Sequence, residues 1–239
     1  MTEVLRGRVA IVTGAGQGIG YAIAHRLADA GMEVWMVARR AGVLQEAADR
    51  IGGLGRAYPA DLTDPAARAK LVDAVRATHG SLDVLVNNAG VIHLGTTEYA
   101  TEEELEEQLS ANVVAPYALT RACLPLLRAA DGQIVFINSS AGKSANPGVG
   151  QFSATQHAVR AFADSLRAEV NQDGIRVTVL HPGRTASPRQ QAIHEGEGKA
   201  YCPDRLMQAD DVAEIVHAAL TLPRTAEVTE ISVRPMLKS

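Results

Sequence analysis

Short apolar segments alternate with longer segments of helical periodicity along most of the chain. The apolar segments are rich in Val, Ile and Leu, as buried strands are, and lie at 8–13, 33–38, 82–87, 132–138 and 175–180. Amphipathic helices are predicted at 19–30, 42–51, 65–78, 102–128, 150–171 and 210–221. Continuous apolar strands separated by helices are typical of a parallel sheet covered on both faces. The pattern therefore predicts an α/β fold with a single Rossmann-type, doubly wound parallel sheet and helices on both faces.

One segment, 184–207, does not follow this alternation. It is polar, contains glycines and prolines, and shows no clear period. Irregular segments of this length often form lids or binding loops, and a plain surface excursion is the alternative. No linker or internal repeat divides the remaining sequence. We therefore predict one domain, 1–239, with a substrate lid at about 184–208, although the length also allows two smaller domains.

Composition and charge narrow the classes of partner. The chain is 46% hydrophobic and 21% charged, which favours a large core over disorder. A net charge of -4 gives no reason to expect a nucleic-acid partner. No segment resembles a signal peptide or a membrane helix, and Cys123 and Cys202 lack the spacing of a redox or zinc site. We expect a cytoplasmic protein that acts on a small molecule, without a metal, nucleic acid or membrane as partner.

A glycine-rich turn joins the first predicted strand to the first helix in "VTGAGQGIG", 12–20. Backbone amides and a helix N-terminus at such a turn can hold a pyrophosphate. The spacing departs from GxGxxG, because counting from Gly14 places Ile19 at the last position. Taken alone, the motif is therefore also compatible with an ordinary tight turn.

The second predicted strand ends in "MVARR", 36–40, where NAD-binding folds usually carry an acidic residue. Arg39 offers a planar cation to a 2'-phosphate instead, with Arg40 as a possible helper. This pattern favours NADP(H) as the cofactor. A solvated arginine at a strand end is the alternative interpretation.

Further motifs follow in order: TGxxxGxG at 13–20, NNAG at 87–90, a helical Asn112, "NSSAG" at 138–142 and "HPG" at 181–183. Together they resemble the classical short-chain dehydrogenase/reductase family over nearly the whole chain. The resemblance implies an NADP(H)-dependent oxidoreductase for a small carbonyl, alcohol or imine, and a homodimer or homotetramer formed through the helices at 102–128 and 150–171. With the two arginines, the implied cofactor-binding residues are Gly14, Gln17, Gly18, Ile19, Gly20, Arg39, Arg40, Asp61, Leu62, Asn88, Ala89, Gly90, Gln156, Pro182, Gly183, Thr185 and Ser187.

In active members of that family a serine polarises the substrate carbonyl, a tyrosine transfers the proton, a lysine lowers the tyrosine pKa and an asparagine holds a water relay. The serine and asparagine resemble Ser139 and Asn112 here. Counting from Ser139, the tyrosine position is Phe152 and the lysine position is Gln156, in "QFSATQ", 151–156. Neither side chain can exchange a proton near neutral pH. The ordinary carbonyl reaction should therefore lose the roughly 100- to 10,000-fold acceleration that a general acid supplies.

Other residues could supply the proton. His93, three residues after NNAG, is a catalytic candidate, although a loop histidine that faces solvent or packs is the favoured interpretation of this position. Lys143 is a second candidate, and His194 and Tyr201 could take part only if the lid closes. A substrate that already carries its positive charge, such as an iminium, would need no proton donor. We expect an oxidoreductase with an altered active site; the alternative is a catalytically inactive cofactor-binding protein or sensor, natural or engineered.

Overall fold

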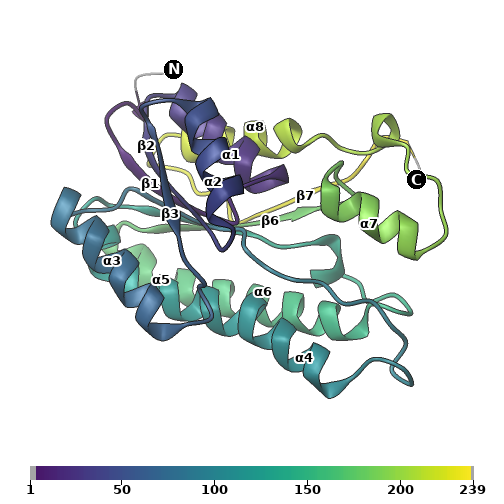
Figure 1. Ribbon diagram of the computed structural model, residues 1–239. Helices are drawn as coiled ribbons and strands as arrows, with labels where there is room; N and C mark the ends of the chain where they lie inside the picture. The colour runs from purple at the N-terminus through teal and green to yellow at the C-terminus, as the bar shows by residue number, and fades with distance from the viewer. Residues whose placement is uncertain (1–3, 238–239) are drawn as a thin grey trace.

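The computed structural model describes residues 4–237, so the first three and last two residues of the predicted domain lie outside the described part. The strands are β1 (Val9–Thr13), β2 (Glu33–Ala38), β3 (Gly55–Pro59), β4 (Val84–Asn87), β5 (Gln133–Ile137), β6 (Arg176–Pro182) and β7 (Glu230–Val233). They form one parallel sheet in the order β3-β2-β1-β4-β5-β6-β7 (Figure 1). The order reverses between β1 and β4. The predicted Rossmann-type sheet is confirmed.

Helices cover both faces of the sheet. They are α1 (Gly18–Asp29), α2 (Ala41–Ile51), α3 (Pro65–His79), α4 (Glu102–Leu109), α5 (Ala115–Arg128), α6 (Gly150–Val170), α7 (Pro188–Gly196) and α8 (Ala209–Leu220). Helices α1, α2 and α8 lie on one face, and α3, α5 and α6 on the other (Figure 1). In β1, Ala10 and Val12 join the core under α1, whereas Val9 and Ile11 join the core over α5. Because successive side chains of a strand point to opposite faces, a strand that is apolar throughout supplies both cores.

Two strands, β3 and β7, were not among the predicted elements. Both lie at the edges of the sheet and are short and partly exposed. An edge strand has fewer neighbours to exclude water, so it does not need the continuous apolar run that marks a central strand.

The prediction of one regular helix over 102–128 was wrong at its centre. Residues Ser110–Val114 form a π-helical turn between α4 and α5. Pro116 has no N–H with which to bond the carbonyl of Asn112 four residues earlier, so an ordinary α-helical bond cannot form there. Single π turns of this kind often occur at functional sites. Asn112 lies within this turn.

The prediction that 184–207 lacks regular structure was wrong for α7. The hydroxyl of Ser187 accepts a hydrogen bond from the Gln190 backbone N–H at 3.1 Å, and Pro188 occupies the first helical position. The helix has only nine residues and is mostly polar, which explains why the sequence shows no apolar period. Within residues 4–237, no helix has the length and apolar content needed to cross a membrane.

Candidate functional site

A cleft of about 620 Å³ opens at the carboxyl ends of β1, β4, β5 and β6, where the strand order reverses. Open α/β sheets characteristically bind ligands at this position. Predicted residues on its walls are Gly14, Gln17, Gly18, Ile19, Gly20, Arg39, Arg40, Asp61, Leu62, Asn88, Ala89, Gly90, Ser139, Phe152, Pro182, Gly183, Thr185 and Ser187. A second space of about 90 Å³, here called the small cavity, shares part of this wall and is also lined by Asn112 and Gln156.

The glycine-rich turn leaves bare backbone at the N-terminus of α1. A Cβ on Gly20 would lie 2.3 Å from the Gly14 carbonyl oxygen and 2.5 Å from Nδ2 of Asn88. Gly18 has φ +57°, in the left-handed region that glycine adopts readily. The turn therefore requires glycine for close packing, and it presents helix N-terminal amides to the cleft. Such a cradle fits a dinucleotide pyrophosphate.

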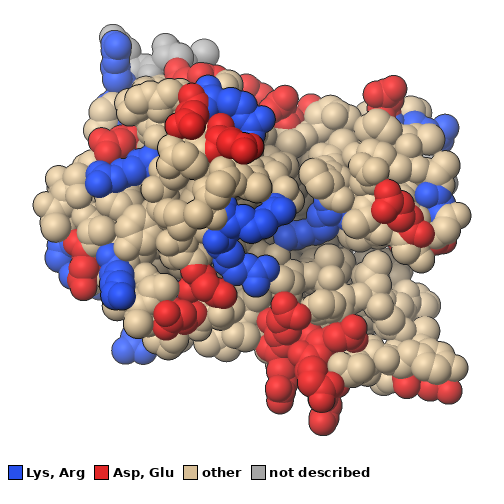
Figure 2. All heavy atoms as spheres, viewed as in Figure 1, with Lys and Arg blue, Asp and Glu red and all other residues tan. Residues whose placement is uncertain are grey.

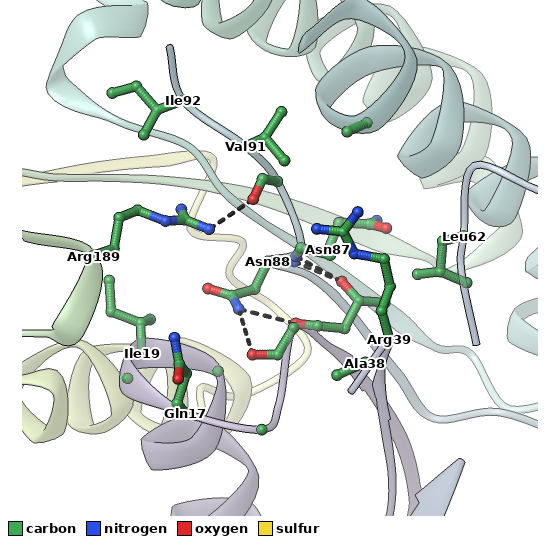
Figure 3. Close-up of a pocket in the computed structure, with 18 of the residues that line it drawn as sticks. Gln17, Ile19, Ala38, Arg39, Leu62, Asn87, Asn88, Val91, Ile92 and Arg189 are labelled. Carbon is green, nitrogen blue, oxygen red and sulfur yellow. Dashed lines mark hydrogen bonds between the residues drawn. The ribbon is translucent and has the colours of Figure 1, made fainter. Parts of the chain in front are cut away.

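The NNAG segment fastens this turn to the end of β4. The hydroxyl of Thr13 accepts hydrogen bonds from the backbone N–H groups of Asn88 and Ala89, both at 2.9 Å, and donates to the Val86 carbonyl at 3.2 Å. Nδ2 of Asn88 donates to the Thr13 carbonyl at 2.9 Å and to that of Gly14 at 3.4 Å (Figure 3). Two segments distant in sequence thus form one rigid wall.

Arg39 and Arg40 lie on the cleft wall directly after β2. Arg40 donates to Oε1 of Gln17 at 2.7 Å, whereas no hydrogen bond or ion pair of Arg39 is found within the described residues. Asp61 accepts hydrogen bonds from the N–H and hydroxyl of Thr63 at 2.9 and 2.7 Å; these bonds, with a smaller contribution from Arg39, lower the pKa of its carboxyl. Because Asp61 is occupied by Thr63, the Arg39 guanidinium is available to an anionic ligand.

Charge is unevenly distributed over this face of the molecule. Basic side chains gather in the hollow at its centre, and acidic side chains cluster beside it over α4 (Figure 2). The sequence of α4, EEELEEQL, supplies these carboxylates. The hollow is therefore a favourable place for an anionic ligand.

Ser139 and Phe152 face the cleft from two different elements. Ser139 follows β5, and its Oγ accepts a hydrogen bond from the Ala141 N–H at 3.1 Å. Phe152 lies in the first turn of α6 and borders both the cleft and the small cavity. Gln156 lies one turn further along α6 and borders only the small cavity.

Buried carboxamides connect these elements. Asn112 accepts from the Val91 N–H at 2.8 Å and donates to the Val91 carbonyl at 2.9 Å and to the Thr155 hydroxyl at 3.1 Å. Gln156 donates through Nε2 to the same hydroxyl at 3.2 Å, and its backbone carbonyl accepts from Asn138 at 2.9 Å. The side chain of Asn112 thus holds α6 beside the segment that follows β4.

The ionisable side chains that line the cleft are Arg39, Arg40, Asp61, Glu107 and Arg189. Arg189 alone among them borders the small cavity. Within residues 4–237, neither space is lined by a tyrosine, a lysine or a histidine. Of the side chains that commonly act as general acids or bases, the described walls therefore hold only the carboxylates of Asp61 and Glu107.

The other predicted proton donors lie behind or outside the walls. Nε2 of His93 donates to Oε2 of Glu107 at 2.8 Å, so His93 touches a residue of the wall without lining it. Lys143 is bound to Glu230 and to the Ser232 hydroxyl. His194 is buried on α7 against the ring of Tyr201, away from both spaces.

Sequence reasoning missed two charged residues of the wall. Arg189 donates through Nη2 to the Gly90 carbonyl oxygen at 2.6 Å. Its position two residues after the predicted Ser187 was the available signal. Glu107 is one of several glutamates on α4, and nothing in that repetitive sequence distinguishes it.

Comparison with known proteins places these features in a family. A model of the short chain dehydrogenase family matches residues 8–198. The protein "Dehydrogenase/reductase SDR family protein 7-like" of Anopheles gambiae is 37% identical over 207 residues, covering 82% of this chain but only 65% of that longer protein. An uncharacterized oxidoreductase of Staphylococcus aureus (strain USA300) is 31% identical over 236 residues, covering 98% of this chain and 99% of its own length.

Solved structures agree with the family match. A serine dehydrogenase complexed with NADP+ superposes with a TM-score of 0.90 at 29% identity, covering 97% of this chain and 96% of that one. A metagenomic short-chain oxidoreductase in complex with NADP superposes with a TM-score of 0.83 at 33% identity, covering 98% of this chain and 99% of that one. A 3-ketoacyl-(acyl-carrier-protein) reductase from Brucella melitensis complexed with NADH superposes with a TM-score of 0.87 at 29% identity, covering 96% of this chain and 97% of that one. Similar structures thus hold either nicotinamide cofactor.

Proposed function

Because the chain belongs to the short chain dehydrogenase family, we propose that it is an NADP(H)-dependent oxidoreductase for a small organic carbonyl, alcohol or imine. The observation that carries the choice of cofactor is the end of β2, where Arg39 lies on the cleft wall without a hydrogen bond or ion pair to any described residue. No Asp or Glu occurs at 36–40 to accept hydrogen bonds from an unphosphorylated ribose. A guanidinium there favours a 2'-phosphate.

The residues present fit such a cofactor. The glycine cradle at the start of α1 would hold the pyrophosphate, and Pro182, Gly183 and Ser187 would border the nicotinamide end. When bound, NADPH supplies the hydride. Ser139 uses its Oγ as an acceptor toward Ala141, which leaves the hydroxyl proton to donate to a substrate oxygen or nitrogen.

Phe152 and Gln156 occupy, in this proposal, the positions that hold the proton-transferring tyrosine and its lysine in active relatives. Their spacing on α6 and their shared border with the small cavity support this correspondence. The aromatic ring preserves bulk, and the glutamine preserves a neutral donor. The pocket shape is kept while the acid and the cation are lost together, which avoids a buried unpaired ammonium.

Proton supply then falls to water, to the substrate's own charge or to His93. The contact of His93 with Glu107 supports the last route, because the carboxylate orients the imidazole and itself lines the cleft. A proton could pass from His93 to a substrate only if the ring turned toward the cleft or a water molecule bridged the gap.

A second candidate function is binding without turnover, as a cofactor-holding pseudoenzyme or redox sensor. The observation that favours it is the lack of tyrosine, lysine and histidine on the described walls of both spaces. The two candidates share the cofactor and differ in hydride transfer.

Cofactor binding is the first test. NADPH and NADH are titrated against the unmodified protein, R39A and R40A. We expect tighter binding of NADPH, a selective loss of at least about tenfold in R39A, and a smaller loss in R40A, whose guanidinium is partly engaged by Gln17. Equal affinities for the two cofactors in the unmodified protein would contradict the NADP(H) assignment.

Turnover is the second test. Oxidation of NADPH is followed with a cyclic imine and with the ketone of the same ring size, using the unmodified protein and H93A. Imine reduction that exceeds ketone reduction supports the enzyme, and a further loss in H93A assigns the proton to that histidine. Tight NADPH binding with no oxidation across a broad panel of imines and carbonyls favours the pseudoenzyme.

A further inference from the structure

Arg189 connects two walls of the cleft. It is the second residue of α7, and its guanidinium reaches the carbonyl oxygen of Gly90, which follows β4 (Figure 3). The side chain is exposed and lines both the cleft and the small cavity. Phe152 also lines both spaces. The Arg189 guanidinium therefore lies at the end of the cleft where hydride transfer is proposed. Arg39 and Arg40, which follow β2, lie at the end proposed for the adenosine.

Arg189 lacks a negative partner within the described residues. None of their carboxylates lies within 4.0 Å of it, and its one hydrogen bond there is to the neutral Gly90 carbonyl. Arg184, five residues earlier, shows the contrast, because it contacts both carboxylate oxygens of Glu197 at 3.0 Å. A guanidinium has five N–H donors, so Arg189 keeps donors for a ligand without breaking its contact with Gly90.

The acidic residues of the cleft are already engaged elsewhere. Asp61 accepts from Thr63 at the Arg39 side, and Glu107 accepts from His93. The small cavity has no carboxylate on its described wall. A charge-assisted bond from Arg189 is therefore open to an anion carried by the molecule that enters beside Phe152.

We propose that Arg189 binds a carboxylate of the substrate, so the substrate class is a small organic acid with its carbonyl or imine carbon within a few atoms of that carboxylate. This inference rests on the proposed function, which supplies the cofactor and the reacting end. The pyrophosphate of the cofactor offers the same chemistry, but the glycine turn already provides it with backbone donors, and Arg189 extends to the small cavity beyond that turn.

The test measures binding of matched acids and amides to the NADPH-loaded protein. The probes are 2-oxopropanoate, 4-oxopentanoate and 5-oxohexanoate, each beside its primary amide, which keeps the shape and removes the charge. NADPH affinity is measured first, so failure of the proposed function is seen separately as absent cofactor binding. Dissociation constants for the probes then follow from the change in NADPH fluorescence.

We expect at least one acid to bind about tenfold more tightly than its amide, and R189M to abolish that preference. R189K, which keeps the charge but not the planar fork, should retain part of it. R39M is the matched control: it should weaken NADPH but leave the acid preference intact at saturating cofactor. NADPH affinity in R189M should stay within about threefold of the unmodified value.

Two results would overturn the assignment. One is that no acid in the series is preferred to its amide although NADPH binds. The other is that R189M weakens NADPH about tenfold and leaves the acid preference unchanged, which would assign the guanidinium to the cofactor pyrophosphate.

Discussion

Changing Phe152 to Tyr and Gln156 to Lys together should raise NADPH-dependent reduction of simple ketones and aldehydes at least ~100-fold, the low end of what a general acid supplies. The two residues lie four apart on α6 and both border the small cavity. The pKa of a phenol is ~10 and must fall by about three units for the group to work at neutral pH, which requires on the order of 4 kcal/mol of stabilisation of the phenolate by its surroundings. The new ammonium would supply that help by favouring the phenolate.

Either single change should do less. F152Y places a phenol where Arg189 is the only cation on the described wall of the small cavity. Q156K places an ammonium at a site that is 7% exposed, with no carboxylate on that described wall. We expect Q156K to lower the free energy of unfolding by about 1–3 kcal/mol. The effects on rate should be non-additive, because the phenol and its tuning charge act as a unit.

The same helix offers a matched control. Phe162 packs against Phe136 and Tyr117, with ring centroids 5.7 and 5.0 Å apart, and His157 is exposed. The variant F162Y/H157K adds a phenol and an ammonium to α6 away from both spaces. Turnover is followed by NADPH absorbance, with cofactor affinity measured in parallel. If F152Y/Q156K binds NADPH but is no faster than this control on a broad carbonyl panel, the proposed correspondence is refuted.

Three further predictions concern the cofactor cradle, assembly and pH. G20A should lose NADPH binding and about 1–3 kcal/mol of stability, because the added methyl would meet the Gly14 carbonyl. G150A should gain stability, because the space around Gly150 is open. Calorimetry with and without NADPH checks both variants. The chain is expected to form a homodimer or homotetramer through the helices at 102–128 and 150–171, where Val114 and Tyr117 are 54% and 46% exposed. V114E/Y117E should therefore give a smaller mass by light scattering. A monomeric mass of the unmodified protein at micromolar concentration would contradict this prediction. Burial lowers the pKa of His181 below its ordinary value of 6.5. The buried neutral imidazole therefore contributes stability that is complete above pH 6.5 and is lost as the pH falls through the folded-state pKa. The Tm should fall between pH 7 and pH 5, and it should fall less in H181N.

The sequence predicted the central strands because a strand covered on both faces is mostly apolar, and β1 and β4 are buried throughout and carry a polar residue only at their last position. The edge strands β3 and β7 escaped because one side of each lacks a neighbouring strand. Glycines of the cradle were predictable, since close backbone approach leaves room for no other residue. The partners of Thr13 and Arg189 were not, because each contact joins residues at least 73 positions apart that only the folded sheet brings together.

The charges around the reacting end also predict how the unmodified site should rank its substrates. A simple iminium brings a positive charge toward Arg189, which disfavours it by like-charge repulsion. An imine that carries its own carboxylate would place the anion at Arg189 and the iminium beside the neutral Phe152 and Gln156. The unmodified protein should therefore reduce such an imino acid faster than the corresponding imino amide. F152Y/Q156K should reduce both substrates more slowly, because each brings an iminium toward the new ammonium. Turnover of the acid and amide pair by both proteins, at saturating NADPH, measures the ranking. An amide reduced as fast as its acid by the unmodified protein would show that Arg189 does not select the substrate.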